Sequence, residues 1–298
     1  MTSVQRGVLL GLGAYAAYSV SDAFIKLLHG SVPMFQLLFL GAALGLLALP
    51  LVKRDGERWS DVWRPRRKAI WWLRVLAGVV NSLGALVAFT HLPMAEAFAL
   101  IFLMPLFVTL LSVLVLREHV GWRRWSAVVL GFAGVLVVLR PGLRELHWGH
   151  AGAVACGLAG ACGVILMRKA GNAESRLTLY SNHLVGNVLI AAVAMLPDMV
   201  WLTPQQWAWV LGYGLLSALG GVLLMQATLQ TAVNHVAPTQ YSQMIWAVLL
   251  GRWLFQDRLD GLTWLGIAII MATGLFTLIR EEHVTGWWHR IRLLLPNQ

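Results

Sequence analysis

Long apolar runs separated by short polar gaps make up most of the chain. A helix needs roughly 20 mostly apolar residues to cross the hydrocarbon core of a bilayer. Cut at that length, the chain gives ten candidate spans, and no gap between them could hold a soluble domain. The expected spans cover residues 7–28, 33–52, 69–91, 94–116, 125–139, 150–167, 177–197, 207–228, 237–255 and 263–278. The pattern therefore predicts an all-α integral membrane protein with ten transmembrane helices.

Composition supports lipid as the solvent of this chain. Of its 298 residues, 58% are hydrophobic and only 12% are charged, which is more apolar surface than a soluble core of that length could bury. A net charge of +10 would suggest nucleic acid in a soluble protein. Here the basic residues lie in short gaps between apolar runs, which is typical of a membrane protein. We therefore expect the lipid bilayer, and no nucleic acid, as a partner.

The two cysteines predict neither a disulfide nor a metal site. Cys156 and Cys162 lie six positions apart in one apolar run, so they point to different sides of a helix. No metal and no cofactor is expected. The sequence leaves the oligomeric state open, and a monomer is compatible with it.

The distribution of Lys and Arg predicts the orientation. These residues are dense between Lys53 and Lys68 and recur in alternate gaps along the chain. Positive residues accumulate on the cytoplasmic side, so both termini should be cytoplasmic in a bacterial-type inner membrane. The first apolar run is longer than the hydrophobic region of a signal peptide and should be retained as a helix. The tail, residues 281–298, carries Trp287 and Trp288 beside Arg290 and should lie along the cytoplasmic membrane surface.

An internal repeat relates the two halves of the chain. Residues 116–140 match residues 255–280 at an offset of 139 or 140 positions. The matched residues are Glu118, Trp125, Gly134 and Arg140 in the first segment and Asp257, Trp264, Gly274 and Arg280 in the second. The predicted halves are residues 1–140 and 141–280, with five helices each. Because five is odd, the halves should enter the membrane in opposite senses, and such inverted repeats place substrate between them near the midplane.

Three motifs carry a family resemblance. The first, in the first half, is Leu-Pro-Met-Ala-Glu-Ala at 92–97, which leads to Met-Pro-Leu-Phe-Val at 104–108 and ends at Arg117-Glu118. The second, in the second half, is Ala-Pro-Thr-Gln-Tyr-Ser-Gln-Met-Ile-Trp-Ala at 237–247. The third is Lys26-Leu-Leu. On these motifs the chain resembles the EamA branch of the drug/metabolite transporter superfamily, which has ten helices in two EamA repeats. The chain departs from the family pattern at Gly41, where relatives often have arginine, and at Asp257, where glutamate is usual.

The resemblance implies transport of a small metabolite. Relatives export amino acids or move S-adenosylmethionine, riboflavin and similar compounds. We expect a secondary transporter for small amphipathic metabolites, foremost an exporter of amino acids, working by alternating access. The alternative within this class is an uptake transporter for S-adenosylmethionine or a vitamin-like metabolite. An integral-membrane enzyme is less favoured, because the chain has no HExxH, GxSxG or Walker motif.

Polar and aromatic residues within otherwise aliphatic spans are the candidates for substrate binding. An amphipathic metabolite needs a few hydrogen bonds and an apolar wall, and both halves should contribute to them. The candidates are Asn81, Phe98 and Phe102 in the first half and Gln226, Gln240, Tyr241 and Trp246 in the second. Interhelical hydrogen bonds and packing are the alternative explanation for these side chains.

Charged residues and a proline within spans are the candidates for coupling or gating. Asp22 and Lys26 are four positions apart, the spacing of a helical ion pair, so either a structural pair or a role in the cavity is open. Glu96 follows Pro93 in the first turn of a helix, where a carboxylate can cap the helix or couple transport to protons. Pro105 should interrupt and kink its helix.

Overall fold

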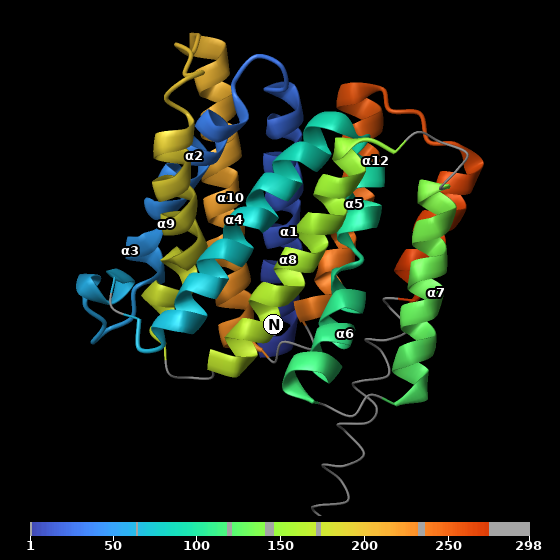
Figure 1. Ribbon diagram of the computed structural model, residues 1–298, viewed down its shortest axis with the longest axis horizontal. Coiled ribbons are helices and arrows are strands. Elements are labelled where there is room, and N and C mark those ends of the chain that lie inside the picture. Colours follow the sequence, from blue (N-terminus) through green and yellow to red (C-terminus); the bar gives the residue numbers. More distant parts are fainter. Residues whose placement is uncertain are drawn as a thin grey trace, which may run out of the picture.

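The computed structural model describes residues 2–63, 65–117, 121–140, 146–170, 174–231 and 236–273. Every regular element within these ranges is a helix, and the helices lie side by side in one bundle (Figure 1). This confirms the predicted all-α class. The tail at 281–298 and the end of the last predicted span fall outside the described residues.

The predicted spans of the first half are present, two of them in two pieces. Its elements are α1 (Ser3–Leu27), α2 (Met34–Leu46), α3 (Leu49–Val52), η1 (Trp59–Trp63), α4 (Lys68–His91), α5 (Met94–Ile101), α6 (Met104–Leu116) and α7 (Trp122–Leu139). The span expected at 33–52 is divided into α2 and α3, and the span expected at 94–116 is divided into α5 and α6.

The second half follows the same plan. Its described elements are α8 (Trp148–Ala170), α9 (Arg176–Ala194), α10 (Pro204–Gln230), η3 (Ala237–Tyr241), α12 (Ser242–Phe255) and the helix Gly261–Thr273. Six helices of the described chain are long and apolar enough to cross a membrane, and shorter apolar helices such as Met34–Leu46 and Gly261–Thr273 accompany them. This set fits ten spans in two five-helix repeats.

Helices α1, α4 and α8 run through the middle of the view in Figure 1, with α2, α9 and α10 on one side and α5, α6, α12 and α7 on the other. The most extensive pairings are α1 with α10 and α4 with α8. Small residues allow the second pairing, because a Cβ atom at Gly84 would lie only 2.6 Å from the carbonyl oxygen of Gly152. Close backbone approach at small residues is typical of helix packing in membranes.

The interruption predicted at Pro105 is present. Helix α5 ends at Ile101 and α6 begins at Met104, so the break directly precedes the proline. Proline has no N–H group to donate to the carbonyl of Ile101 four residues earlier. Gly157 of α8 packs against that carbonyl, since a Cβ atom there would lie 3.0 Å from the Ile101 oxygen. The break therefore coincides with a close contact between the two halves.

The sequence repeat recurs in backbone geometry. Helix α6 ends at Arg117 with φ 56°, and α12 ends at Gln256 with φ 53°, both in the left-handed region that residues other than glycine seldom adopt. Each cap donates its backbone N–H to the residue five positions earlier, Ser112 in α6 and Gly251 in α12. The two caps are separated by the same offset as the matched residues of the repeat.

The two ends of the bundle are named here from α1. The end that carries the turn between α1 and α2, uppermost in Figure 1, is called the distal end, and the end at which α1 begins is called the proximal end. The distribution of Lys and Arg predicts that the proximal end is cytoplasmic.

Candidate substrate site and distal closure

Asp22 and Lys26 lie one turn apart on α1, but they do not pair. The Lys26 Nζ atom lies 2.9 and 2.8 Å from the two carboxylate oxygens of Asp257 and 4.5 Å from the centre of the Phe255 ring. A pair between Asp22 and Lys26, one of the two alternatives allowed by their spacing, is therefore not what the structure contains. The left-handed cap of α12 brings Asp257 to the end of α1, and this tertiary contact displaces the local one.

Asp257 joins three helices. It follows α12, binds Lys26 of α1, and accepts a hydrogen bond of 3.1 Å from the backbone N–H of Met94 at the start of α5. A carboxylate at a helix N-terminus satisfies an otherwise unpaired N–H group and is favoured by the helix dipole. Asp257 of the second half thus ties together two helices of the first half at the distal end.

Two further polar contacts link the halves at the distal end. Glu96 of α5 is buried, and its Oε1 atom lies 3.3 Å from Nε2 of His150 on α8. Arg140, which caps α7, binds Asp260, and Thr263 donates its backbone N–H to the same carboxylate. Hydrogen bonds from Arg140 and Thr263 hold the pKa of Asp260 well below its usual range. Together with the Lys26–Asp257 pair, these contacts form what we call the distal closure.

His147 lies beside His150 at this end. Partial loss of hydration, followed by the neighbouring His150 and His91, lowers the pKa of His147. The ring centres of His147 and His150 are 4.4 Å apart.

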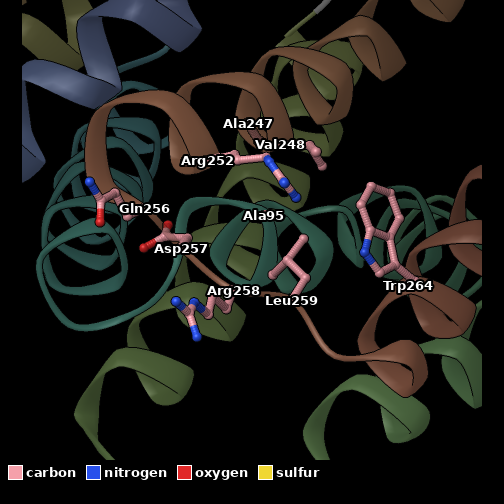
Figure 2. Close-up of a pocket in the computed structure, with 10 residues that line it drawn as sticks. Ala95, Ala247, Val248, Arg252, Gln256, Asp257, Arg258, Leu259 and Trp264 are labelled. Carbon is pink, nitrogen blue, oxygen red and sulfur yellow. The ribbon is translucent and has the colours of Figure 1, made fainter.

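A pocket of about 570 Å³ lies beside Asp257 at the distal end (Figure 2). Its lining residues are Ala95, Ala247, Val248, Gly251, Arg252, Gln256, Asp257, Arg258, Leu259 and Trp264. Arg252 and Arg258 are exposed, so this pocket is a polar recess on the outside of the closure. It does not reach the residues predicted to bind substrate.

In the interior, Asp22 has a different environment from Lys26. Asp22 is half-buried, and no hydrogen bond to its carboxylate occurs within the described part of the chain. Tyr18 lies one turn before Asp22 on the same helix, and Ser21, next to Asp22, donates a hydrogen bond of 2.8 Å to the carbonyl oxygen of Tyr213 on α10. Asp22 thus lies where a helix of the first half packs on a helix of the second.

Three of the predicted binding residues come together at the contact between the halves. The ring centres of Phe98 and Phe102 are 6.1 Å apart, and Phe102 lies 5.7 Å from Tyr241 of the second half. All three side chains are buried, and Phe89 extends the cluster at 5.0 Å from Phe98. They form an apolar wall that spans both repeats.

The other predicted binding residues are dispersed. Asn81 donates hydrogen bonds to the carbonyl oxygen and the sulfur of Cys156, at 2.8 and 3.2 Å, so its amide joins α4 to α8. Gln240 is half-buried beside Tyr241. Gln226 and Trp246 are exposed, and the structure does not bring them to the aromatic wall.

Of the tyrosines, sequence reasoning singled out only Tyr241 as a binding residue. The chain has five, and four of them, Tyr15, Tyr18, Tyr180 and Tyr213, lie half-buried on α1, α9 and α10. Scattered single tyrosines in apolar runs have no periodic signal. The only signal in the sequence was the glycines that face these rings. At Gly41, for example, a Cβ atom would lie 2.3 Å from the Tyr213 ring, so only glycine leaves room for it.

Comparison with known proteins identifies the class. The EamA-like transporter family matches residues 5–140 and 147–279. The chain therefore belongs to the EamA-like transporter family, and it is a multi-pass membrane protein that transports small metabolites and is not an enzyme.

Relatives with known substrates differ in cargo and direction. The chain is 25% identical over 294 residues to an S-adenosylmethionine uptake transporter from Rickettsia conorii, with 95% of this chain and 97% of that protein covered. It is 28% identical to the pseudopaline exporter CntI from Pseudomonas aeruginosa, with 90% and 94% covered. The fold is also similar to that of a protein solved by crystallography, with a TM-score of 0.63 at 16% sequence identity. The match covers 93% of this chain and 98% of the solved chain.

Proposed function

We propose that the protein is a secondary transporter that moves amino acids, or small amphipathic metabolites built like them, by alternating access between its two halves. One observation supports this most strongly: charged contacts between the halves close the distal end above an interior that holds an acidic side chain and an aromatic wall. A carrier needs a site in the interior and an end that can close over it.

The chemistry of the interior favours an amino-acid-like cargo. Asp22 can bind a positively charged group of the cargo, and the wall of Phe98, Phe102 and Tyr241 can hold an apolar part of it. Charged contacts near the interface can be broken and remade during a cycle, which suits a closure better than an apolar seal does. Export is the direction we propose for amino acids, with the proximal end facing the cytoplasm.

Uptake of S-adenosylmethionine is the second candidate. It is supported by the relative from Rickettsia conorii, which covers nearly all of the chain. S-Adenosylmethionine is itself an amino acid derivative, so both candidates use the same interior groups and differ in direction and size of cargo.

Counterflow in proteoliposomes tests the function. Vesicles containing the purified protein are loaded with an unlabelled amino acid or S-adenosylmethionine, and uptake of the labelled compound is followed with and without a pH gradient. A carrier accumulates label transiently when unlabelled substrate is inside, whereas a channel does not. Absence of counterflow for every compound in the panel would contradict the proposal.

A further inference from the structure

We propose that Asp22, Tyr18 and Tyr213 form a binding site for a positively charged side-chain group of the substrate, so that the transporter selects compounds with a side-chain onium group, such as a sulfonium, over analogues that lack this charge. The inference rests on the proposed function and specifies the chemical class that the interior binds.

The carboxylate of Asp22 is available to a ligand. Lys26, one turn away on the same helix, is the nearest cation in the sequence, but both Asp257 oxygens and the Phe255 ring engage its ammonium group. Within the described residues no donor binds Asp22, which nevertheless remains half-buried rather than sealed. An ionised carboxylate inside a membrane needs a positive partner, and a cationic substrate supplies one.

Tyrosine rings provide the second element of a cation site. The faces of aromatic rings attract cations, and an onium group with no N–H donor depends on such faces. Tyr18 lies one turn before Asp22 on α1, and Ser21, next to Asp22, donates a hydrogen bond of 2.8 Å to the carbonyl oxygen of Tyr213 on α10. Neither ring is fully buried. One belongs to each half, so the site is shared between the halves.

Glycines position these rings. A Cβ atom at Gly220 would lie 2.9 Å from the Tyr18 ring, and one at Gly41 would lie 2.3 Å from the Tyr213 ring. Any larger residue at either position would move the ring. Glycine at these two positions therefore leaves room for the rings of Tyr18 and Tyr213 on the helices that face them.

Further tyrosines continue from Asp22 toward the proximal end. The ring centre of Tyr15 lies 6.2 Å from that of Tyr18 on the same helix. Tyr180 of α9 is close as well, because a Cβ atom at Gly221 would lie 3.4 Å from the hydroxyl oxygens of both Tyr18 and Tyr180. The distal closure lies on the opposite side of Asp22. Aromatic rings therefore lie between Asp22 and the proximal end.

Two matched ligand pairs test the inference by binding. In each pair the compounds differ by one methyl group and one positive charge: S-adenosylmethionine against S-adenosylhomocysteine, and S-methylmethionine against methionine. Affinity for the purified full-length protein in detergent is measured from ligand-induced thermal stabilisation. We expect the sulfonium compound of each pair to bind roughly tenfold or more tightly than its thioether.

Variants localise the selectivity. Asp22→Asn should reduce the preference to about twofold or less, and Asp22→Glu should keep it, because the charge is retained. Tyr18→Leu should weaken sulfonium binding by roughly fivefold, whereas Tyr18→Phe, which keeps the ring face, should not. Asp198→Asn, which removes an exposed acid between α9 and α10, is the matched control and should leave the preference unchanged.

Equal binding of sulfonium and thioether in both pairs by the unmodified protein overturns the inference, whichever variants fold. A preference that survives in Asp22→Asn also overturns it. The proposed function fails separately: selective sulfonium binding without counterflow would retain the cation site and reject the carrier, whereas counterflow without any sulfonium preference would do the reverse.

Discussion

Lys26 and Asp22 lie on the same face of α1, one turn apart, but their environments differ. Lys26 is fully engaged by a carboxylate and a ring from the second half at the distal end. Asp22 lies deeper, one turn from Tyr18 on α1 and next to Ser21, which donates a hydrogen bond to the carbonyl oxygen of Tyr213. No described residue donates a hydrogen bond to Asp22. In the proposed transport cycle, this contrast separates two tasks of a carrier: holding one end shut, and keeping a charged group available inside.

The difference also shows why local spacing is a poor guide within a membrane. A helical pair at this spacing is worth only about 0.2–0.5 kcal/mol in an isolated helix. Asp257 also accepts a hydrogen bond at the N-terminus of α5, where the helix dipole stabilises a carboxylate. This position stabilises the Lys26–Asp257 pair more than the helical spacing would stabilise a pair between Lys26 and Asp22. Tertiary structure therefore decided the partner of Lys26.

The largest effect should come from breaking the pair between Lys26 and Asp257. Lys26→Met leaves Asp257 without its cation, and both side chains are mostly buried, at 16% and 14% exposure, so the loss of stability should be about 2–3 kcal/mol. Unfolding in detergent measures it. The double variant Lys26→Met/Asp257→Asn should lose less than the single one. Additive losses would show that the contact contributes nothing as a pair.

A smaller loss should follow from opening the aromatic wall. Tyr241→Ala removes a buried ring packed on Phe102 and should cost about 2 kcal/mol while weakening transport. Trp246→Ala is the matched control on α12, because Trp246 is 37% exposed, and its loss should stay within about 0.5 kcal/mol. If Trp246→Ala impairs transport more than Tyr241→Ala does, the substrate path runs along a different face of α12.

Pro105→Ala should alter turnover more than stability. Alanine restores an N–H group that can bond the Ile101 carbonyl, which straightens the helix where it contacts Gly157. We expect a protein of nearly unchanged melting temperature whose counterflow is slowed about fivefold. Normal counterflow in this variant would exclude the break from the transport cycle.

The smallest expected effect is on the stability of the protein at low pH. The pKa of Asp260 is held below its usual range, so the folded state binds its proton less readily than the unfolded chain does. The stability from this contact is present above the ordinary aspartate pKa, about 3.9, and is lost as the pH falls further. Melting curves between pH 7 and pH 3 should show a steeper acid loss for the unmodified protein than for Asp260→Asn. Identical curves would show that the Arg140–Asp260 contact does not affect stability.

Much of the fold was accessible from the sequence because apolar run length and the need to pair backbone groups leave few options in lipid. The break at Pro105 followed from one missing N–H group. The substrate site was less accessible. Phe98, Phe102 and Tyr241 meet as a cluster, but Asn81 serves an interhelical hydrogen bond and Trp246 faces outward.

The missed features depend on contacts between distant segments. Asp257 and Lys26 are 231 positions apart, and no local rule connects them. Tyr213 becomes a neighbour of Asp22 only when α1 packs along α10, and single tyrosines in apolar runs resemble ordinary packing residues. The glycines within the spans were the useful signal, because each can face a large side chain on another helix.

Reversible locking of the distal end tests the central claim most directly. In a protein with Cys156→Ala and Cys162→Ala, the substitutions Lys26→Cys and Asp257→Cys place two thiols where the ion pair was, and a short bis-methanethiosulfonate reagent joins them. Both charges are removed together, so no unpaired charge remains. Counterflow of S-adenosylmethionine or an amino acid should stop on cross-linking and return when a reductant cleaves the link. Unchanged counterflow in the cross-linked protein would show that substrate passes without the distal end opening and would contradict alternating access at this closure.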